Sequence, residues 1–419
     1  MASPPLRIVL TTALTATALA AAATLTAFSA QAATDSTSLT RWSSDAEFRA
    51  GTTTSTKISG GAITISKPFG KQVIADPYGD KKKKTYDYGE WTSPWVSTGF
   101  DAKTLIPSWN ADTSGSTWIR VFVRGKTATK TGSWDTIADW AYGVSGTHRY
   151  SGTSQTDDLS KLDVDTVVTN GSNRYRQWQV KVQLMRPTGT TATPAINSIG
   201  AVASTYSTRS AAVSKTTITA NTELAVPRYS QMIHKGQFTQ WGGGGASWCS
   251  PTSVSMVLRF FKTGPVPADY AWSKYPDSWV DHAARYTYDH RYDGAGNWPF
   301  NTAYAGRYDL DAFVTRLNDL RDAEAFIKQG IPVVASVKYA KGALTGAAVS
   351  SSAGHLLVIV GVQKDGKVIV NDPAASGNSS VRRVYQRAQF EKAWLGGSGG
   401  VTYVIRPESK PLPANTARW

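Results

Sequence analysis

The apolar residues follow two different spacings along the chain, and the change between them sets the broadest limit on its fold. Between residues 36 and 205 they alternate with polar residues, so that Ile119, Val121 and Val123 share one face of the segment 116–126. Similar short runs recur between clusters of Gly, Ser, Thr, Asp and Asn, without a convincing helical spacing. Short strands separated by turns are typical of an antiparallel β-sandwich or jelly roll. We therefore predict an all-β domain over residues 36–205.

The second half of the chain mixes helical and strand-like spacing. Residues 206–222 are small and polar without clear periodicity, and we interpret them as a linker. We predict an α+β domain over residues 223–407, followed by a tail over residues 408–419. The expected helices and strands of this domain cover residues 253–261, 309–330, 331–339, 355–362 and 367–373.

The first residues have the features of a secretory signal peptide. Arg7 supplies a positive charge, residues 8–28 are apolar and uncharged, and Ala30-Gln31-Ala32 has the small-x-small pattern of a cleavage site. We assign residues 1–32 to this signal, with a retained membrane anchor as the alternative. No later stretch is long and apolar enough to span a bilayer. The mature protein is expected to be exported or associated with the cell wall, without stable membrane insertion.

The charge and the aromatic residues indicate which partners to expect. The formal net charge of +15 suits anionic wall polymers, acidic polysaccharides or lipid head groups, although it also serves solubility alone. An exported chain without a recognition motif argues against nucleic acid as a partner. The Trp and Tyr residues of the β domain either stack on sugar rings or fill the core between its sheets.

Cys249 is the only cysteine, so no disulfide can form within the chain. It follows a run of glycines and precedes Pro251, which suits the first turn of a helix. Val254, Val257 and Leu258 then follow at helical spacing. The N-terminal edge of a helix favours a thiolate, whereas an inert core cysteine would sit within an apolar stripe. We therefore expect Cys249 to be a functional thiol.

A thiolate needs a neighbouring histidine, and His355 is the best placed of the five. It opens an apolar strand directly after the flexible segment 350–354, whereas the other four histidines have no such frame. Asp372 ends the next strand and could orient the imidazole. A simple two-residue hairpin would leave His355 and Asp372 four residues out of register, roughly 13 Å along the strand. A bulge or a wider loop around Gly361 would be needed to bring them together.

Four blocks in order carry a resemblance to a known family: "VPRYSQ" (226–231), "WCSPTSVSMVL" (248–258), "GHLLVIVGV" (354–362) and "VIVNDPA" (368–374). The chain resembles the C39-like cysteine peptidases of the papain-like superfamily over residues 226–407. The resemblance implies a papain-like fold for the α+β domain.

The resemblance also implies roles for single residues. Cys249 would be the nucleophile, His355 the general base and acid, and Asp372 the residue that orients it. Gln231 lies in the block that carries the oxyanion glutamine of this family, while Gln237 and Gln240 lie closer to the cysteine and stay open as alternatives. One departure from the family pattern is Ser250, which stands where glycine is usual.

These residues predict a secreted cysteine peptidase or amidase that cleaves a peptide or a peptide-containing cell-wall substrate by acyl transfer. The alternatives are a non-catalytic wall or polysaccharide binding protein on a papain-like scaffold, and an acyltransferase that uses the same Cys–His pair. No metal or organic cofactor is needed, and the histidines lack zinc-ligand spacing. Trp248, Trp298 and Gly354 are expected to contact substrate, although the aromatic segment 296–306 could equally be a packed loop.

Overall fold

The computed structural model describes residues 36–156 and 158–414. The predicted signal peptide and the last residues of the predicted tail lie outside this described part. Within it, no helix combines the length and the apolar character that crossing a bilayer requires.

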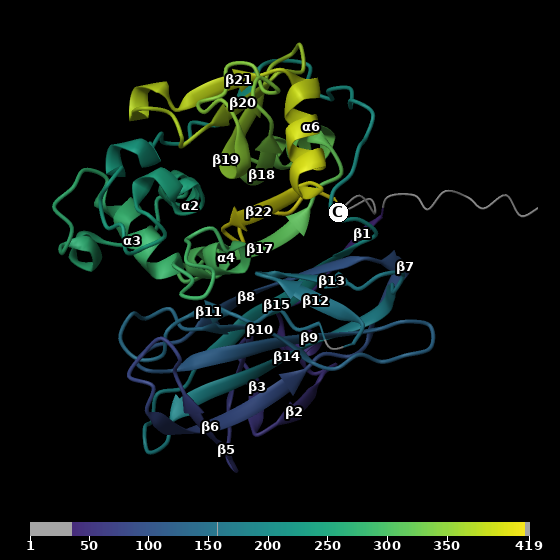
Figure 1. The fold of residues 1–419 in the computed structure, drawn as a ribbon, viewed down its shortest axis with the longest axis vertical. Coiled ribbons are helices and arrows are strands. Elements are labelled where there is room, and N and C mark those ends of the chain that lie inside the picture. The colour runs from purple at the N-terminus through teal and green to yellow at the C-terminus, as the bar shows by residue number, and fades with distance from the viewer. Residues whose placement is uncertain (1–35, 157, 415–419) are drawn as a thin grey trace, which may run out of the picture. The chain divides into compact units, whose positions relative to one another are not determined.

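The first half forms two packed antiparallel sheets, as the alternating pattern predicts (Figure 1). One sheet has the order β12-β13-β8-β15-β4-β3, with β1 also paired to β15. Its strands are β1 (Thr37–Trp42), β3 (Thr56–Ser59), β4 (Ala62–Ile65), β8 (Thr104–Asp112), β12 (Ser160–Asp163), β13 (Thr166–Thr169) and β15 (Ala195–Ser204). The other sheet has the order β11-β10-β9-β14-β6-β2, with β5 on β6 and β7 on β14. Its strands are β2 (Thr52–Thr54), β5 (Gly70–Ala75), β6 (Lys83–Thr92), β7 (Val96–Ala102), β9 (Trp118–Lys126), β10 (Asp135–Trp140), β11 (Tyr150–Ser151) and β14 (Tyr175–Pro187).

Tryptophans fill the space between the two sheets. Trp42 lies edge-on to Trp91 and to Trp178, with ring centroids 5.5 and 5.9 Å apart, and all three are buried. Edge-to-face pairs of this kind add to the stabilisation from buried area. These tryptophans therefore belong to the core and are not available to sugars.

The second half is built on an antiparallel sheet of order β17-β22-β18-β19-β20-β21, with β16 paired to β19. Its strands are β16 (Thr222–Glu223), β17 (Asp311–Arg316), β18 (Val333–Tyr339), β19 (Ser352–Val362), β20 (Val368–Asn371), β21 (Arg382–Tyr385) and β22 (Val401–Arg406). The α-helices of the described part are α1 (Asp45–Phe48) in the sandwich and α2 (Cys249–Phe260), α3 (Ser278–Thr287), α4 (Trp298–Gly306), α5 (Leu320–Lys328) and α6 (Arg387–Ser398) in this half. Short 3₁₀ turns add η1 (Gln231–His234), η2 (Gly245–Ser247), η3 (Pro267–Tyr270) and η4 (Asn378–Ser380). This half is α+β, as predicted.

The helix predicted over residues 309–330 is wrong in its first part, because residues 311–316 form strand β17. Phe313 packs into the core around α5 and α6, while Val314 packs toward the sandwich. Both faces of the strand are buried, so apolar residues occupy both and the alternation that marks a strand is lost. The helix begins only after Asp319, whose side chain accepts a hydrogen bond from the Arg321 N–H.

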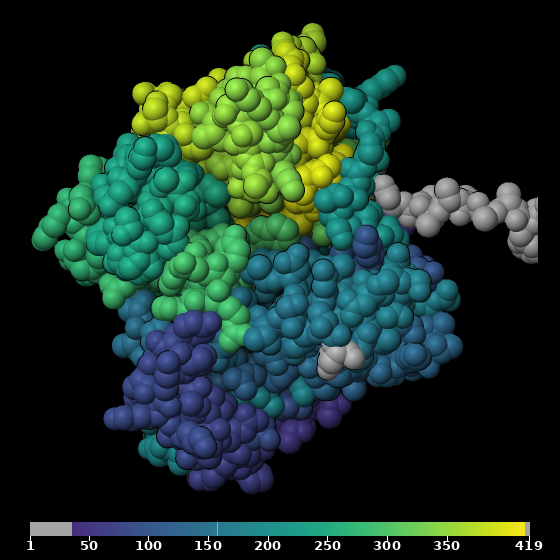
Figure 2. Space-filling view, in the orientation of Figure 1, coloured from purple at the N-terminus to yellow at the C-terminus, as the bar shows by residue number. Residues whose placement is uncertain are grey.

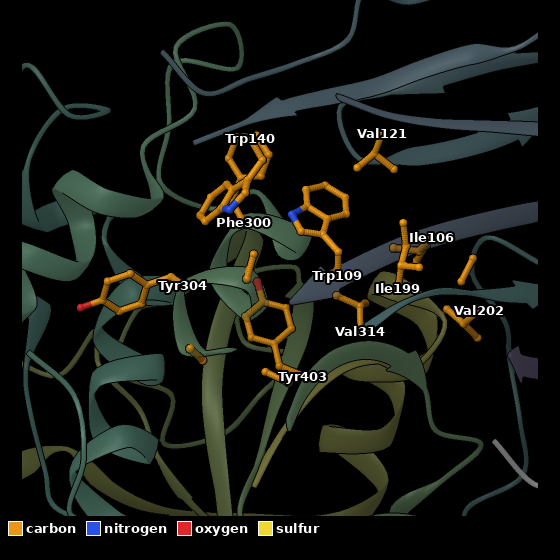
Figure 3. Packing of buried hydrophobic residues seen from close by; sticks show 14 of the residues in the cluster. Ile106, Trp109, Val121, Trp140, Ile199, Val202, Phe300, Tyr304, Val314 and Tyr403 are labelled. Carbon is orange, nitrogen blue, oxygen red and sulfur yellow. The ribbon is translucent and has the colours of Figure 1, made fainter. Parts of the chain in front are cut away.

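The sandwich and the α+β half pack into one compact unit. Phe300 of α4 lies beside Trp109 and Trp140 of the sandwich, with ring centroids 6.3 and 5.0 Å away (Figure 3). Asn110 of β8 donates to the carbonyl of Ala312 at 2.8 Å and accepts from its N–H at 3.1 Å. Figure 2 shows the green segment that contains α4 lying against the blue sandwich.

The segment between the halves, residues 207–221, has no helix or strand but is held along α5 and α6. The N–H of Ser214 donates to Glu391, and the N–H of Thr217 donates to Glu324 at 2.7 Å. Arg387 pairs with Glu324 at 2.7 Å and donates to the Ser214 carbonyl. These buried charges fix the path of the segment along the second half.

Candidate active site

Cys249 is the first residue of helix α2, as the sequence predicts. The glycines before it are required by the backbone: Gly242, Gly243 and Gly244 have φ values of 67°, 86° and 82°. A Cβ on Gly245 would lie 2.3 Å from the His234 carbonyl carbon, so this turn packs directly on η1. The loop therefore delivers the thiol to the end of the helix where backbone N–H groups have no partner within the helix.

Helix α2 is held against the sheet by two small hydroxyl side chains. Ser253 donates to the carbonyl of Leu356 on β19 at 3.2 Å. Ser250 lies 3.0 Å from the hydroxyl of Tyr403 on β22 and is fully buried. The serine that replaces the usual glycine after the cysteine therefore anchors the helix start to the sheet.

The hairpin that carries His355 and Asp372 is shifted in register twice. The N–H of Gln363 donates to the Lys367 carbonyl at 2.8 Å, so the turn has three residues between these two. A bulge next to Gly361 shifts the pairing of β19 and β20 by one more residue. The two shifts add, so the offset falls from four residues to two, within diagonal reach of side chains. The expectation was a bulge or a wider loop around Gly361, and the hairpin has both.

The His355 Nε2 and the Asp372 Oδ1 are 2.7 Å apart, and both side chains are buried. The Tyr385 hydroxyl donates to the other oxygen of Asp372 at 2.7 Å. The N–H of Ala374 donates to Oδ1 at 3.0 Å. Because Nε2 faces the carboxylate, Nδ1 is the nitrogen left for the thiol.

The pKa of Cys249 is lowered and the pKa of His355 is raised, so each side chain favours its charged form. Burial alone would raise the pKa of Cys249, but the hydrogen bond and charge of His355, with the Leu356 and Ser250 backbones, lower it. Burial would lower the pKa of His355, but the charge and hydrogen bond of Asp372 and the contact with Cys249 raise it. The charge of His355 and the surrounding donors likewise outweigh burial and lower the pKa of Asp372. The site thus favours a thiolate beside an imidazolium.

Cys249 and His355 line an open cleft of about 780 Å³. Gln231 lines the same cleft, and its Nε2 donates to the Ala246 carbonyl at 2.7 Å. Gln237 instead donates to the carbonyl of Ile233 and lies outside this lining. Gln240 is exposed and also lies outside it. Of the three glutamines considered, Gln231 is the one that the structure places beside Cys249.

The three residues expected to contact substrate have different positions. Trp298 and Gly354 line the cleft, together with residues on both sides of Gly354. Trp248 does not: its side chain is fully buried, and its indole N–H donates to the Trp241 carbonyl at 2.8 Å. Its ring belongs to a small core that it shares with residues of α3. The expectation that Trp248 contacts substrate is therefore wrong.

The other histidines lie away from the thiol. His148, His234, His282 and His290 are absent from the cleft lining in the described structure. His148 is 2.7 Å from a carboxylate oxygen of Asp76. Burial lowers the pKa of His282 and of His290 to about 4. Across the described ranges, no group of three or more His, Cys, Asp or Glu side chains could hold a metal ion.

Two parts of the site were missed in the sequence. Tyr385 holds Asp372, but a lone tyrosine in a strand gives no signal of that role. The β12–β13 hairpin of the sandwich lines the cleft with Asp163, Val164 and Asp165. It was missed because the sequence pattern separates the two halves and contains no information on how they pack.

A β-sandwich followed by an α+β domain with a thiol, an imidazole and a carboxylate in line has the features of a cysteine-peptidase-type protein. The comparison with known families agrees. Residues 223–400 match the Peptidase_C39 like family, and residues 38–204 match the Peptidase C39 N-terminal domain. Both matches are consistent with a C39-like peptidase that carries this N-terminal domain, and they confirm the resemblance seen in the four sequence blocks.

Solved structures similar to the sandwich are carbohydrate-binding modules. One is the low affinity xylan binding module CBM86 from Roseburia intestinalis, with 10% identity, 39% of this chain and 93% of that chain covered, and a TM-score of 0.19. Another is the family 11 module from Clostridium thermocellum, with 13% identity, 36% and 86% covered, and a TM-score of 0.13. At these scores the assignment of a sandwich rests on the strands themselves. No curated protein matches the chain.

Proposed function

We propose that the protein is a secreted cysteine peptidase or amidase with Cys249 as nucleophile, His355 as general base and acid, and Asp372 as the residue that orients His355. The observation that supports it best is the connected series of contacts from thiol to imidazole to carboxylate at an open cleft. A helix N-terminus and a held imidazole are the two devices that activate a cysteine. The papain-like fold is part of this proposal.

The mechanism follows from these positions. The Cys249 thiolate attacks an amide carbonyl. The Cys249 backbone N–H and the Gln231 side chain stabilise the negative charge that forms on the oxygen by donating hydrogen bonds to it. An amide NH₂ has two N–H bonds, so Gln231 can hold Ala246 with one and the oxyanion with the other. His355 protonates the leaving amine, and water activated by His355 then releases the acyl group from sulfur.

Hydrolysis of a peptide library by the full chain tests this proposal. We expect Cys249→Ala to abolish cleavage and His355→Ala to lower kcat/KM by at least about a thousandfold. His148→Ala is the matched control, because it also removes a histidine that contacts an aspartate, yet lies outside the cleft. Cleavage that survives in Cys249→Ala, or that falls equally in His148→Ala, would refute the assignment.

We also propose that the outer face of the sandwich binds an anionic polysaccharide of the cell wall. Arg124 lies over the rings of Trp95 and Trp134, at 4.9 and 4.4 Å from their centroids. Lys181 lies 4.6 Å from the Trp134 ring centroid as well. Electrophoresis in gels with polygalacturonate or xylan should show retardation by the first only, and Trp134→Ala should remove it. Equal mobility in both gels would contradict the proposal.

A further inference from the structure

The catalytic cleft is built by both halves of the protein. The α+β half supplies Cys249, His355 and Gln231, while the sandwich supplies residues 163–166 at the tip of its β12–β13 hairpin. The sequence pattern alone gives no sign that the sandwich contributes to the active-site cleft. In the structure the sandwich is instead one wall of the space that a substrate must enter.

The hairpin is fixed rigidly in that position. Asp165 is 7% exposed, and its Oδ2 accepts the N–H of Trp298 at the start of α4, at 2.8 Å. The Asp165 N–H closes the turn on the Asp163 carbonyl at 2.7 Å. Between them Val164 has a φ of 54°, a conformation that a β-branched residue adopts only when its surroundings enforce it. The wall therefore has a defined shape, which selectivity requires.

The wall carries negative charge in a chain that is strongly positive. The exposed Asp163 and Asp293 carry this charge, whereas burial raises the pKa of Asp165 to about 7, and the cleft lining contains neither lysine nor arginine. Asp163 and Asp293 are exposed, and within the described residues neither forms an ion pair. One oxygen of Asp293 accepts the Tyr288 hydroxyl at 2.5 Å, which leaves its other oxygen for a ligand. The nearby cations Lys161 and Arg291 do not line the cleft, but they line a neighbouring hollow of about 420 Å³ that shares Asp163 with it. The charge of the cleft wall is thus available to a ligand.

Two further observations connect this wall with substrate binding beside the thiol. Tyr292, which also lines the cleft, has its pKa raised by burial and then by the charges of Asp165 and Cys249, so it lies within reach of both. Gln231 is 3% exposed, and its Oε1 accepts no hydrogen bond from the described part of the protein. A buried acceptor without a donor costs free energy, which a substrate N–H would recover.

We propose, on the basis of the peptidase function proposed above, that Asp163 and Asp293 form a specificity subsite that takes an amine or guanidinium group next to the scissile bond. The sandwich then determines which substrate is cleaved, through the carboxylates at the edge of the cleft. A neutral isostere of the same shape lacks the charge and gains nothing from this wall.

Binding to the full-length Cys249→Ala protein tests the subsite without depending on catalysis. The probes are two capped hexapeptide libraries that are identical except for arginine or citrulline at one fixed position. We expect about fivefold tighter binding of the arginine library at low salt, and no preference in Asp163→Asn/Asp293→Asn. Asp101→Asn is the control for lost charge, because Asp101 is an exposed aspartate of the sandwich outside the cleft.

Hydrolysis by the protein with Cys249 intact then separates the two proposals. A preference in binding without any hydrolysis would leave the subsite standing and refute the peptidase function. Hydrolysis with equal kcat/KM for the arginine and citrulline libraries, together with equal binding, would refute the subsite and leave the peptidase function standing. A preference that survives in the double variant would also overturn the subsite.

Discussion

At the scale of single residues, the proposed site depends on how Asp372 is held. Its two carboxylate oxygens receive a hydroxyl, a backbone N–H and the imidazole of His355. A carboxylate that accepts several hydrogen bonds stays ionised in a buried place. That charge keeps His355 protonated, and the imidazolium in turn favours the thiolate of Cys249.

Tyr385→Phe tests this support. Removing one donor raises the pKa of Asp372, so the acid limb of the kcat/KM profile should move to higher pH. The loss of a hydrogen bond to a charged group should also cost about 2 kcal/mol of unfolding free energy. Tyr403→Phe is the matched control, because its hydroxyl contacts neutral Ser250 instead of a carboxylate. If both variants keep the acid limb of the wild type, Tyr385 does not act through Asp372.

At the scale of elements, the sequence predicted those helices and strands that local residues determine, but not those that tertiary packing determines. The start of α2 was predictable because Pro251 and the glycines act locally. Strand β17 was not, because its two faces are covered by different cores. The register that brings His355 to Asp372 could not be predicted from the sequence. The bulge next to Gly361 that sets it depends on how β16 approaches β19. A Cβ on Gly361 would lie 2.2 Å from the Thr222 carbonyl oxygen.

The β12–β13 hairpin should also leave a pH signature in stability. Burial raises the pKa of Asp165 to about 7, above its ordinary value of about 3.9. The folded protein therefore binds this proton more tightly than the unfolded chain, and ionisation between about pH 4 and pH 7 opposes folding. Relative to Asp165→Asn, which stays neutral, the wild type should lose up to about 4 kcal/mol across this range.

Urea unfolding of both proteins at several pH values measures this difference. Asp101→Asn serves as the control, since that carboxylate is exposed and paired with Arg176. A stability difference between the wild type and Asp165→Asn that is constant from pH 4 to pH 7 would contradict the account.

At the scale of the whole molecule, the sandwich and the α+β half share apolar core and polar contacts. Phe300 is fully buried where α4 meets the sandwich. Both halves were predictable from the sequence but their packing was not, because an interface between distant segments leaves no periodic pattern. The cleft exists in its present form only because the halves pack together.

We expect one unfolding transition in calorimetry, and Phe300→Ala should shift that single transition to lower temperature. Loss of a buried phenylalanine costs about 3–5 kcal/mol. Phe261→Ala, at a half-buried position, should cost less. Two separate transitions in the wild type, with only one affected by Phe300→Ala, would show that the halves fold independently.

The proposed function requires Cys249 to be a thiolate beside His355, and the pH dependence of its alkylation measures this. The rate of Cys249 modification by iodoacetamide should show an inflection below the ordinary thiol value of about 8.5. In His355→Ala the inflection should move upward, and in His148→Ala it should stay where it is. An inflection at or above about 8.5 in the wild type, unmoved in His355→Ala, would contradict the account.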